Sequence, residues 1–513
     1  MKEEVQKTNT SDSWIIALFL FVSGLVIFEF FAGVNQPILE AHSFRQTQTA
    51  LTSYFFTIND FSFFYETPIF GEPWSIPFEL PIYQYLVAQI SVYSGLPLTV
   101  IGRAVSLLFL FATCIPVYGI LVKILGFGRS ASFFTLSLII STPFYVFWST
   151  TFMIETVALF LTISFLYFSL KMILNNDWSY KNSIFCSLFL VMAGLQKVTT
   201  VFPVAILLLF LFIYLWVADK RVFNFNKKLI VALVLGVISI IVIYSWIQFT
   251  DYVKEANEIG QRLTSSNLSG WNYGKISQRI SEKFWIDTIF NRHLLKVGIP
   301  YISIGILLWA MCSVKDRHMS NFFILLLLLF IGPMLIFTNL HIVHNYYQVS
   351  NVIYIIIAFG ISTFIFVNNF FKKLYLIVPI LSVVLASNFY IYYNGIGKKK
   401  NSIFDSSTSK IIAISEFIKS NTDNNSAILI YGNDWSSTLA FYSQRKSLTV
   451  PNWGNLPLDS LNHTEKYINP DLIKSIVNCP NKEKDELNKL IVKRFEVVSH
   501  TKIHKCDVYL INK

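Results

Sequence analysis

The sequence predicts a multi-span α-helical membrane protein that carries a small α/β domain at its C-terminal end. Of its 513 residues, 54% are hydrophobic and only 14% are charged, whereas about a quarter of the residues of a soluble protein are charged. Apolar runs of bilayer-spanning length recur as far as residue 393, and a polar stretch follows from residue 395. These observations exclude a soluble enzyme and divide the chain into a membrane domain, 1–394, and a polar domain, 395–513.

The apolar runs give about eleven membrane spans. The run at 183–217 is too long for one span and contains Gln196 and Lys197, so we predict a short helix, a turn at Lys197 and a second helix. Two further spans would follow if the region 79–99 formed a hairpin, but a weakly polar stripe favours an interfacial or re-entrant helix there. The runs lie at 14–34, 101–122, 130–148, 153–174, 183–217, 229–249, 298–313, 321–339, 349–367 and 374–393.

Basic residues in the short loops predict the orientation. Cytoplasmic loops are enriched in Lys and Arg, and the basic pairs alternate consistently if the N-terminus is cytoplasmic. The loops 35–99 and 250–297 and the polar tail then lie outside the cytoplasm, in a multi-pass protein of the inner (plasma) membrane. The residues used are Lys2, Lys7, Lys123, Arg129, Lys171, Lys181, Lys220, Arg221, Lys227, Lys228, Lys315, Arg317, Lys372 and Lys373.

The same distribution explains much of the formal charge of +11, so a nucleic-acid partner is not expected. The five cysteines show no zinc-binding spacing. Cys479 and Cys506 lie in the tail, and an oxidising compartment would allow them to form a disulfide bond.

The tail has the pattern of an α/β domain. An amphipathic helix is expected at 408–420, followed by a strand at 427–431 and a turn at 432–434 that leads into another helix. A helix at 482–493 and strands near 495–499 and 507–511 complete the pattern.

Several polar residues are expected on the outer face of the membrane, where buried polar groups are often functional. Glu40, His42 and Arg45 follow the first span directly; Glu40 is the candidate general base. Each could instead be an ordinary loop residue or a contact to lipid head groups.

Two further candidates begin or interrupt spans. Glu155 begins the span after the second outer loop, where a helix N-terminus favours a carboxylate in any case. Lys197 lies among some thirty apolar residues and needs water or an anion such as a phosphate; snorkelling to the interface is the alternative.

Two more segments could bind substrate. The turn His341-x-x-His344-Asn345-Tyr346-Tyr347 could hydrogen-bond a sugar or a phosphate, and its two His residues alone are a weak metal signal. Glu79 begins a segment that returns to the membrane, and its carboxylate could contact substrate or metal.

The order of these features resembles the GT-C class of integral membrane glycosyltransferases, in the branch of the protein O-mannosyltransferases and the lipid A aminoarabinose transferase. The matching segments are Glu40-x-His-x-Phe-Arg-Gln-x-Gln-Thr, Glu79-Leu-Pro-Ile-Tyr-Gln-Tyr, Glu155, Gly194-Leu-Gln-Lys, the His-Asn-Tyr-Tyr turn and an external C-terminal domain. In that class the first acid is usually Asp, often within an Asp-Glu pair, whereas this chain has Glu40 followed by Ala41. This departure argues against transfer to protein Ser or Thr and leaves the acceptor open.

The resemblance implies a hexosyl- or pentosyltransferase of the cell envelope that uses a polyprenyl-phosphate-linked sugar, inverts the anomeric carbon and makes lipopolysaccharide or another surface glycan, with a lipid or glycan acceptor. Glu40 and Glu155 would be catalytic, and Arg45 and Lys197 would hold the donor phosphate. The remaining substrate-binding candidates are His42, Gln46, Glu79, Tyr83, His344, Asn345 and Tyr346.

A divalent metal is an open possibility, because some members of the class bind one through a Glu and a His; Glu79, His344 and His293 are the candidates here. Two other functions remain alternatives. One is a flippase or transporter of a lipid-linked glycan, which would be expected to show internal repeats and polar residues at the membrane midplane. The other is a polymerase or ligase of surface polysaccharide.

Overall fold

The computed structural model describes residues 9–217, 227–314, 316–371, 374–397 and 407–512. Seven of the basic residues used to predict the orientation fall outside these ranges: Lys2, Lys7, Lys220, Arg221, Lys315, Lys372 and Lys373.

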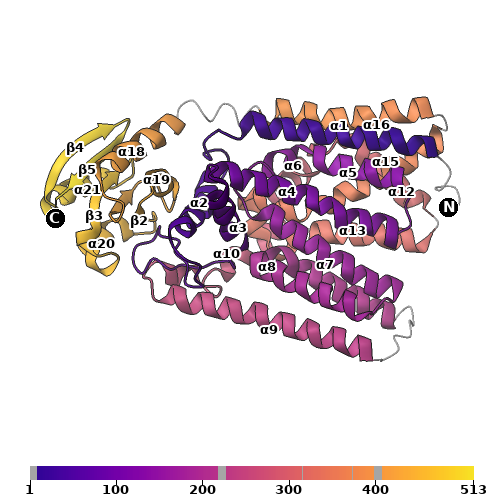
Figure 1. Cartoon of the computed structure of the whole chain (residues 1–513), viewed down its shortest axis with the longest axis horizontal. Coiled ribbons are helices and arrows are strands. Elements are labelled where there is room, and N and C mark those ends of the chain that lie inside the picture. The colour runs from indigo at the N-terminus through magenta and orange to yellow at the C-terminus, as the bar shows by residue number, and fades with distance from the viewer. Residues whose placement is uncertain (1–8, 218–226, 315, 372–373, 398–406, 513) are drawn as a thin grey trace.

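A bundle of long apolar helices forms most of the molecule, and Figure 1 shows them running side by side. Within the described residues, eight helices are long and apolar enough to cross a membrane, or nine if the pair Lys283–Lys296 and Pro300–Ser313, bent by 91°, is one span. The bundle comprises α1 (Asn9–Gly33), α4 (Leu98–Gly119), the π-helical turn η1 (Ile120–Ile124), α5 (Arg129–Ser141), α6 (Pro143–Trp148), α7 (Glu155–Asn175), α8 (Tyr180–Val217), α9 (Lys227–Glu255), α12 (Pro300–Ser313), α13 (Arg317–Ile336), α15 (Val352–Phe370) and α16 (Leu374–Asn394).

Helix α8 reverses direction at Lys197, whose φ of −164° and ψ of 90° are not helical. The rings of Trp178, just before α8, and Phe212, near its end, are 5.9 Å apart. In a straight helix these two positions would be about 50 Å apart, since each residue rises about 1.5 Å. The predicted turn at Lys197 is therefore present, and α8 makes two passes. This reversal and the shorter apolar helix α5 account for the difference between nine helices and the eleven expected spans.

Short helices cover one end of the bundle and lie between it and the C-terminal domain, as Figure 1 shows for α2, α3 and α10. Helix α3 has 13 residues, which is too short to cross a bilayer. The region 79–99 is therefore no span, as expected. The elements at this end are α2 (Ser43–Ile58), α3 (Ile82–Ser94), η2 (Gly260–Leu263), α10 (Ser269–Tyr273), α11 (Ile276–Arg279), η3 (Lys283–Asn291), η4 (Leu294–Lys296), α14 (Thr338–Val343) and η5 (Asn345–Ser350).

The C-terminal domain is a five-stranded sheet in the order β2-β1-β3-β5-β4, with helices packed on it. Strand β1 runs parallel to β2 and β3, whereas β5 is antiparallel to β3 and β4. The predicted first strand, all three predicted helices and the last two strands are present; β2 and β3 were not predicted. The elements are α18 (Ser407–Asn421), β1 (Ala427–Tyr431), α19 (Thr438–Ser443), β2 (Lys446–Thr449), α20 (Leu456–Asn462), η6 (Thr464–Lys466), η7 (Pro470–Leu472), β3 (Ile473–Asn478), α21 (Lys484–Arg494), β4 (Val497–Ile503) and β5 (Cys506–Ile511). Cys479 and Cys506 form a disulfide bond between the ends of β3 and β5.

The first loop holds this domain against the bundle by pairing with the edge strand β2. Gly71 N donates to the Ser447 carbonyl (3.1 Å), and Ser447 N and Thr449 N donate to the carbonyls of Pro68 and Ile69 (2.9 Å each). Gly71 has a φ of +77°, and a Cβ there would lie 2.2 Å from the carbonyl oxygen of Tyr467, so only glycine fits. The sheet is thereby fixed above the end of the bundle where the candidate residues lie.

Candidate functional site

Lys197 and Glu155 form an ion pair at the end of the bundle beneath the C-terminal domain. Lys197 Nζ lies 2.6 Å from Glu155 Oε1, and the two side chains are 10% and 3% exposed. Glu155 is the first residue of α7, where the helix dipole favours its negative charge, and Lys197 is held at the turn of α8. The ammonium also lies 4.2 Å from the centre of the Tyr347 ring, a cation–π contact. The turn thus places one cation against a carboxylate and an aromatic face.

Arg45 brings a second cation to the same region. It lies on the first turn of α2, donates to Gln48 Oε1 (2.8 Å) and contacts both oxygens of Glu79 at 3.2 Å. Gln84 donates to Glu79 Oε1 as well (2.8 Å). Burial works to lower the pKa of Arg45, but the charge of Glu79, followed by Tyr346 and Glu155, raises it above its ordinary value. Arg45 is therefore a permanent positive charge within electrostatic reach of Glu155.

Two neutral histidines lie beside these cations. His42 Nε2 is 2.9 Å from Asn345 Oδ1, and the rings of His42 and His344 are 5.4 Å apart. Burial lowers the pKa of His42, against its hydrogen bond to Asn345. Burial, with the nearby His42 and Lys197, lowers the pKa of His344 to about 4. At neutral pH both imidazoles are uncharged and can donate or accept hydrogen bonds.

His42 also has a strained backbone, because its φ of 55° and ψ of 40° lie in the left-handed region. A non-glycine residue there costs about 1–3 kcal/mol, and such residues are enriched at functional sites.

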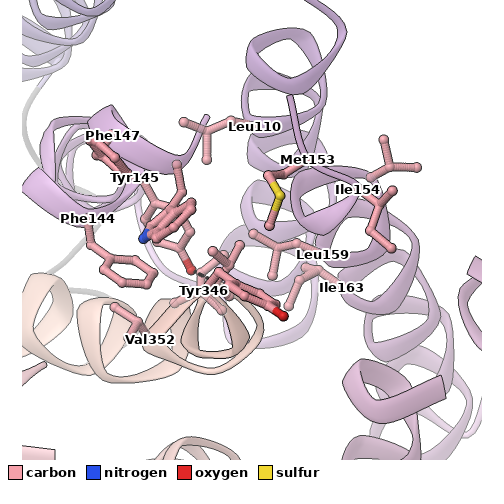
Figure 2. Close-up of a cluster of buried hydrophobic side chains, with 14 of the residues drawn as sticks. Leu110, Phe144, Tyr145, Phe147, Met153, Ile154, Leu159, Ile163, Tyr346 and Val352 are labelled. Carbon is pink, nitrogen blue, oxygen red and sulfur yellow. Dashed lines mark hydrogen bonds between the residues drawn. The ribbon is translucent and has the colours of Figure 1, made fainter. Parts of the chain in front are cut away.

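Tyr346 anchors the turn that carries His344 and Asn345. Figure 2 shows its ring among buried side chains of the bundle, including Leu159 and Ile163 of α7. Tyr145 fixes the same segment by donating its hydroxyl to the Val349 carbonyl at 2.7 Å. The rings of Tyr346 and Tyr347 stack at 4.8 Å. The bundle core therefore determines where His344 and Tyr347 are presented.

Glu40 lies apart from this group, in a fully buried pair with Arg103 of α4. Arg103 Nη2 is 2.8 Å from Glu40 Oε1, and both side chains are 0% exposed. This ion-pair contact does not have the geometry of a hydrogen bond, and neither carboxylate oxygen of Glu40 accepts a hydrogen bond from the described residues. Arg103 also donates to the carbonyls of Thr150 (2.6 Å), Gln36 and Pro37. A general base must reach the proton it removes, and this carboxylate exposes no surface to a substrate.

Three other predicted residues are buried in packing contacts. Gln46 accepts from Phe152 N and donates to the Ala41 carbonyl. Tyr83 donates its hydroxyl to the Gly102 carbonyl at 2.8 Å. His293 is buried beside Phe144, and its Nδ1 contacts the Thr288 carbonyl.

The metal candidates do not fit a metal site. Among the residues that the structure describes, no group of three or more His, Cys, Asp or Glu side chains is arranged to hold an ion. The oxygens of Glu79 are engaged by Arg45 and Gln84, and His293 contacts Phe144 and Thr288.

Arg103 and Gln84 were not predicted as site residues. A sequence signal existed for Arg103, since an ionisable residue inside an apolar run is often functional or paired. The only sequence signal for Gln84 was its place on the weakly polar stripe of the region 79–99.

Comparison with known proteins shows the fold. No protein-family model matches the chain, and no curated protein matches it by sequence. Among solved structures, it is similar to ArnT from Cupriavidus metallidurans bound to undecaprenyl phosphate, with a TM-score of 0.65, 11% identity and coverage of 96% of this chain and 97% of ArnT.

Two further solved structures are similar. The archaeal oligosaccharyltransferase AglB from Archaeoglobus fulgidus, in complex with an inhibitory peptide and a dolichol-phosphate, gives a TM-score of 0.59 at 10% identity, covering 99% of this chain and 75% of AglB. The arabinofuranosyltransferase AftD from Mycobacteria gives 0.52 at 11% identity, covering 96% and 40%. The chain has the fold that resemblance to the GT-C class implies.

Proposed function

We propose that the chain is a membrane glycosyltransferase that moves a sugar from a polyprenyl-phosphate donor to a lipid or glycan acceptor, with inversion, on the extracytoplasmic face. The observation that carries the proposal is the arrangement of Lys197, Arg45 and Glu155 at one end of an apolar bundle. Two cations beside a carboxylate suit a reaction in which a phosphate leaves while a hydroxyl loses its proton. Two proteins of the same fold, ArnT and AglB, are bound to undecaprenyl phosphate and a dolichol-phosphate.

The cations would act on the donor. Lys197 has three N–H donors and contacts one carboxylate oxygen, and Arg45 can contact a phosphate with two parallel donors. The phosphate of a polyprenyl donor already lies at the membrane surface, so the enzyme needs no nucleotide-binding fold to hold it. Lys197 and Arg45 would hold that phosphate and stabilise the negative charge that grows on it as the sugar leaves.

Glu155 would act on the acceptor. The donor phosphate competes for Lys197 and releases Glu155 Oε1, which accepts the proton of the acceptor hydroxyl. The acceptor oxygen forms a bond to the anomeric carbon while the bond from that carbon to the phosphate oxygen breaks, and the polyprenyl phosphate leaves. One displacement inverts the anomeric carbon. His42, His344 and Asn345, neutral at physiological pH, would orient sugar hydroxyls.

Glu40 has a positioning role in this proposal. Its partner Arg103 binds the first loop at Gln36 and Pro37 and the second loop at Thr150. The pair therefore aligns the loop that carries His42 and Arg45 with the loop that leads to Glu155.

The extracytoplasmic placement is supported by the disulfide bond between Cys479 and Cys506, because disulfides persist in oxidising compartments. Helix α2, which carries Arg45, lies beside the C-terminal domain at one end of the bundle (Figure 1), so the site and the domain would face the same compartment.

The test compares surface glycans and glycolipids of cells that carry the wild-type chain or Glu155→Gln. Loss of a general base typically lowers a rate by about 10²–10⁴-fold, so the glycan that depends on this enzyme should disappear. Glu282→Gln is the matched control, since Glu282 is an exposed acid in the loop 250–297. Unchanged glycans in cells with stable, membrane-inserted Glu155→Gln would contradict the proposal.

A further inference from the structure

Aromatic side chains continue from the site onto the C-terminal domain. The ring of Phe44 lies 5.9 Å from that of His344 and is stacked on Trp435 at 6.2 Å. Trp435 in turn lies 6.1 Å from Trp453. The three side chains are partly exposed. We name Phe44, Trp435 and Trp453 the aromatic platform; it leads outward from His344, a residue beside Lys197 and His42.

The sheet topology independently marks the same place. Trp435 lies in the loop after β1, and Trp453 lies in the loop after the neighbouring parallel strand β2. Strand β1 pairs with β2 on one side and β3 on the other, so the chain order reverses between β1 and β3. In open α/β sheets, ligands bind outside the carboxyl ends of parallel strands at such a reversal. Trp435 follows β1 at this reversal and contacts Phe44 of α2, and Trp453 lies beside it at the same edge.

The platform is surrounded by polar groups. Asp434 and Asn452 are exposed, and Asn452 N donates to Asp434 Oδ1 at 3.0 Å, which ties the two loops together. The guanidinium of Arg262 lies 5.6 Å from the centre of the Trp453 ring. The guanidinium therefore lies over one face of the Trp453 ring, and the exposed side chains of Asp434 and Asn452 supply further donors and acceptors beside the platform.

We propose that this platform binds a carbohydrate acceptor, so that the acceptor is a glycan and not a simple lipid. This inference rests on the glycosyltransferase function proposed above. A sugar ring has an apolar face of C–H bonds that packs on an aromatic ring, and hydroxyls at its edge that need hydrogen-bond partners. An acyl chain has no polar group to pair with the exposed side chains of Asp434 and Asn452 beside the rings.

The direction of the platform also fits an acceptor. A polyprenyl donor keeps its tail in the bilayer, so its sugar enters the site from the bundle. The aromatic platform reaches His344 from the opposite side, through the C-terminal domain. A glycan chain bound there would present its terminal hydroxyl to Glu155, across from the phosphate at Lys197.

The experiment measures binding of oligosaccharides, released from surface glycans of the source organism, to the full-length protein in detergent by saturation-transfer NMR. Trp453→Ala should weaken binding about 10-fold, the loss of one stacking contact, whereas Trp453→Phe should keep most of it. Trp216→Ala is the matched control, because Trp216 lies near the far end of α8. If Trp453→Ala does not fold, Asn452→Ala removes an exposed amide and should weaken binding two- to threefold.

Two results would contradict glycan binding by the aromatic platform without contradicting the proposed glycosyltransferase function. One is equal oligosaccharide binding by wild type and Trp453→Ala. The other is no oligosaccharide binding by a wild-type protein that still transfers sugar to a lipid. Failure of the enzyme proposal is separate, since it is decided by the glycans of Glu155→Gln cells. The platform is supported if Trp453→Ala loses oligosaccharides but binds undecaprenyl phosphate as the wild type does.

Discussion

Two carboxylate–cation pairs lie at the same end of the bundle and differ in their surroundings. Arg103 and Glu40 are both fully buried, and the guanidinium also binds backbone carbonyls of two loops. Lys197 and Glu155 keep some exposed surface, and the ammonium otherwise contacts the faces of Tyr346 and Tyr347. The first pair is enclosed by protein on every side, whereas the second retains donors that a ligand can reach.

The difference indicates how one end of a membrane protein can combine rigidity and reactivity. A buried arginine with a planar fork of donors suits several fixed acceptors, and a lysine is a compact charge that can exchange partners. The Glu40–Arg103 pair therefore suits alignment of loops, and the Lys197–Glu155 pair suits exchange of a carboxylate for a phosphate. Three substitutions test this comparison.

Arg103→Met should have the largest effect on stability. Removing one partner of a buried ion pair leaves an uncompensated charge and costs about 3–5 kcal/mol, and here Glu40 would be left in a fully buried site. Lys197→Met should cost less, because the side chains of the Lys197–Glu155 pair are 10% and 3% exposed, whereas those of the Arg103–Glu40 pair are both 0% exposed. Thermal denaturation of the two purified variants in the same detergent measures the difference.

The double variant Arg103→Met with Glu40→Leu provides the control, since replacing a buried pair by apolar residues is often neutral or stabilising. It should recover much of the stability lost in Arg103→Met. Equal melting temperatures for Arg103→Met and Lys197→Met would contradict the comparison.

Much of the fold could be predicted from the sequence, because local patterns determine it. The lengths of the apolar runs predicted the membrane-spanning helices. The single Lys197 within an apolar run too long for one span indicated the reversal of α8. Strand β2 was missed because it has only four residues and pairs with β1 and with residues 68–71 of the first loop. Strand β3 was missed although it has six residues; it pairs with β1 and β5. Contacts between segments far apart in sequence leave no local pattern.

The site was predicted less completely, for a similar reason. The polar residues of the first loop formed one cluster in the sequence, yet the fold divides them: His42 contacts Asn345, Arg45 contacts Glu79, and Glu40 contacts Arg103. Neighbours along a loop can point in opposite directions, and only the packing of α4 decides which carboxylate is enclosed. A single sequence identifies such residues by type but does not show which partner each one takes.

Lys197→Met should weaken binding of undecaprenyl phosphate about 10–100-fold, because a hydrogen bond to a charged group contributes about 1.5–3 kcal/mol. Lys171→Met is the matched control: Lys171 forms an ion pair with Asp177, 3.2 Å away, beyond the opposite end of α7. Native mass spectrometry of the detergent-solubilised protein measures both affinities. If both variants bind undecaprenyl phosphate as the wild type does, the Lys197–Glu155 pair is not the phosphate site.

The smallest expected effect is on the pH dependence of stability, and it tests the surroundings of Lys197 and not those of the Arg103–Glu40 pair. His344 has a pKa of about 4 in the folded protein, lowered by burial and by nearby cations, and about 6.5 in an unfolded chain. As pH falls from about 6.5 to 4, the unfolded chain takes up the proton first, so His344 destabilises the fold progressively in this range. His344→Gln removes this penalty. Its melting temperature should therefore rise relative to wild type by about 1–3 °C between pH 7.5 and 4.5. A difference that stays constant across this range would mean that burial and the nearby charges do not lower the pKa of His344.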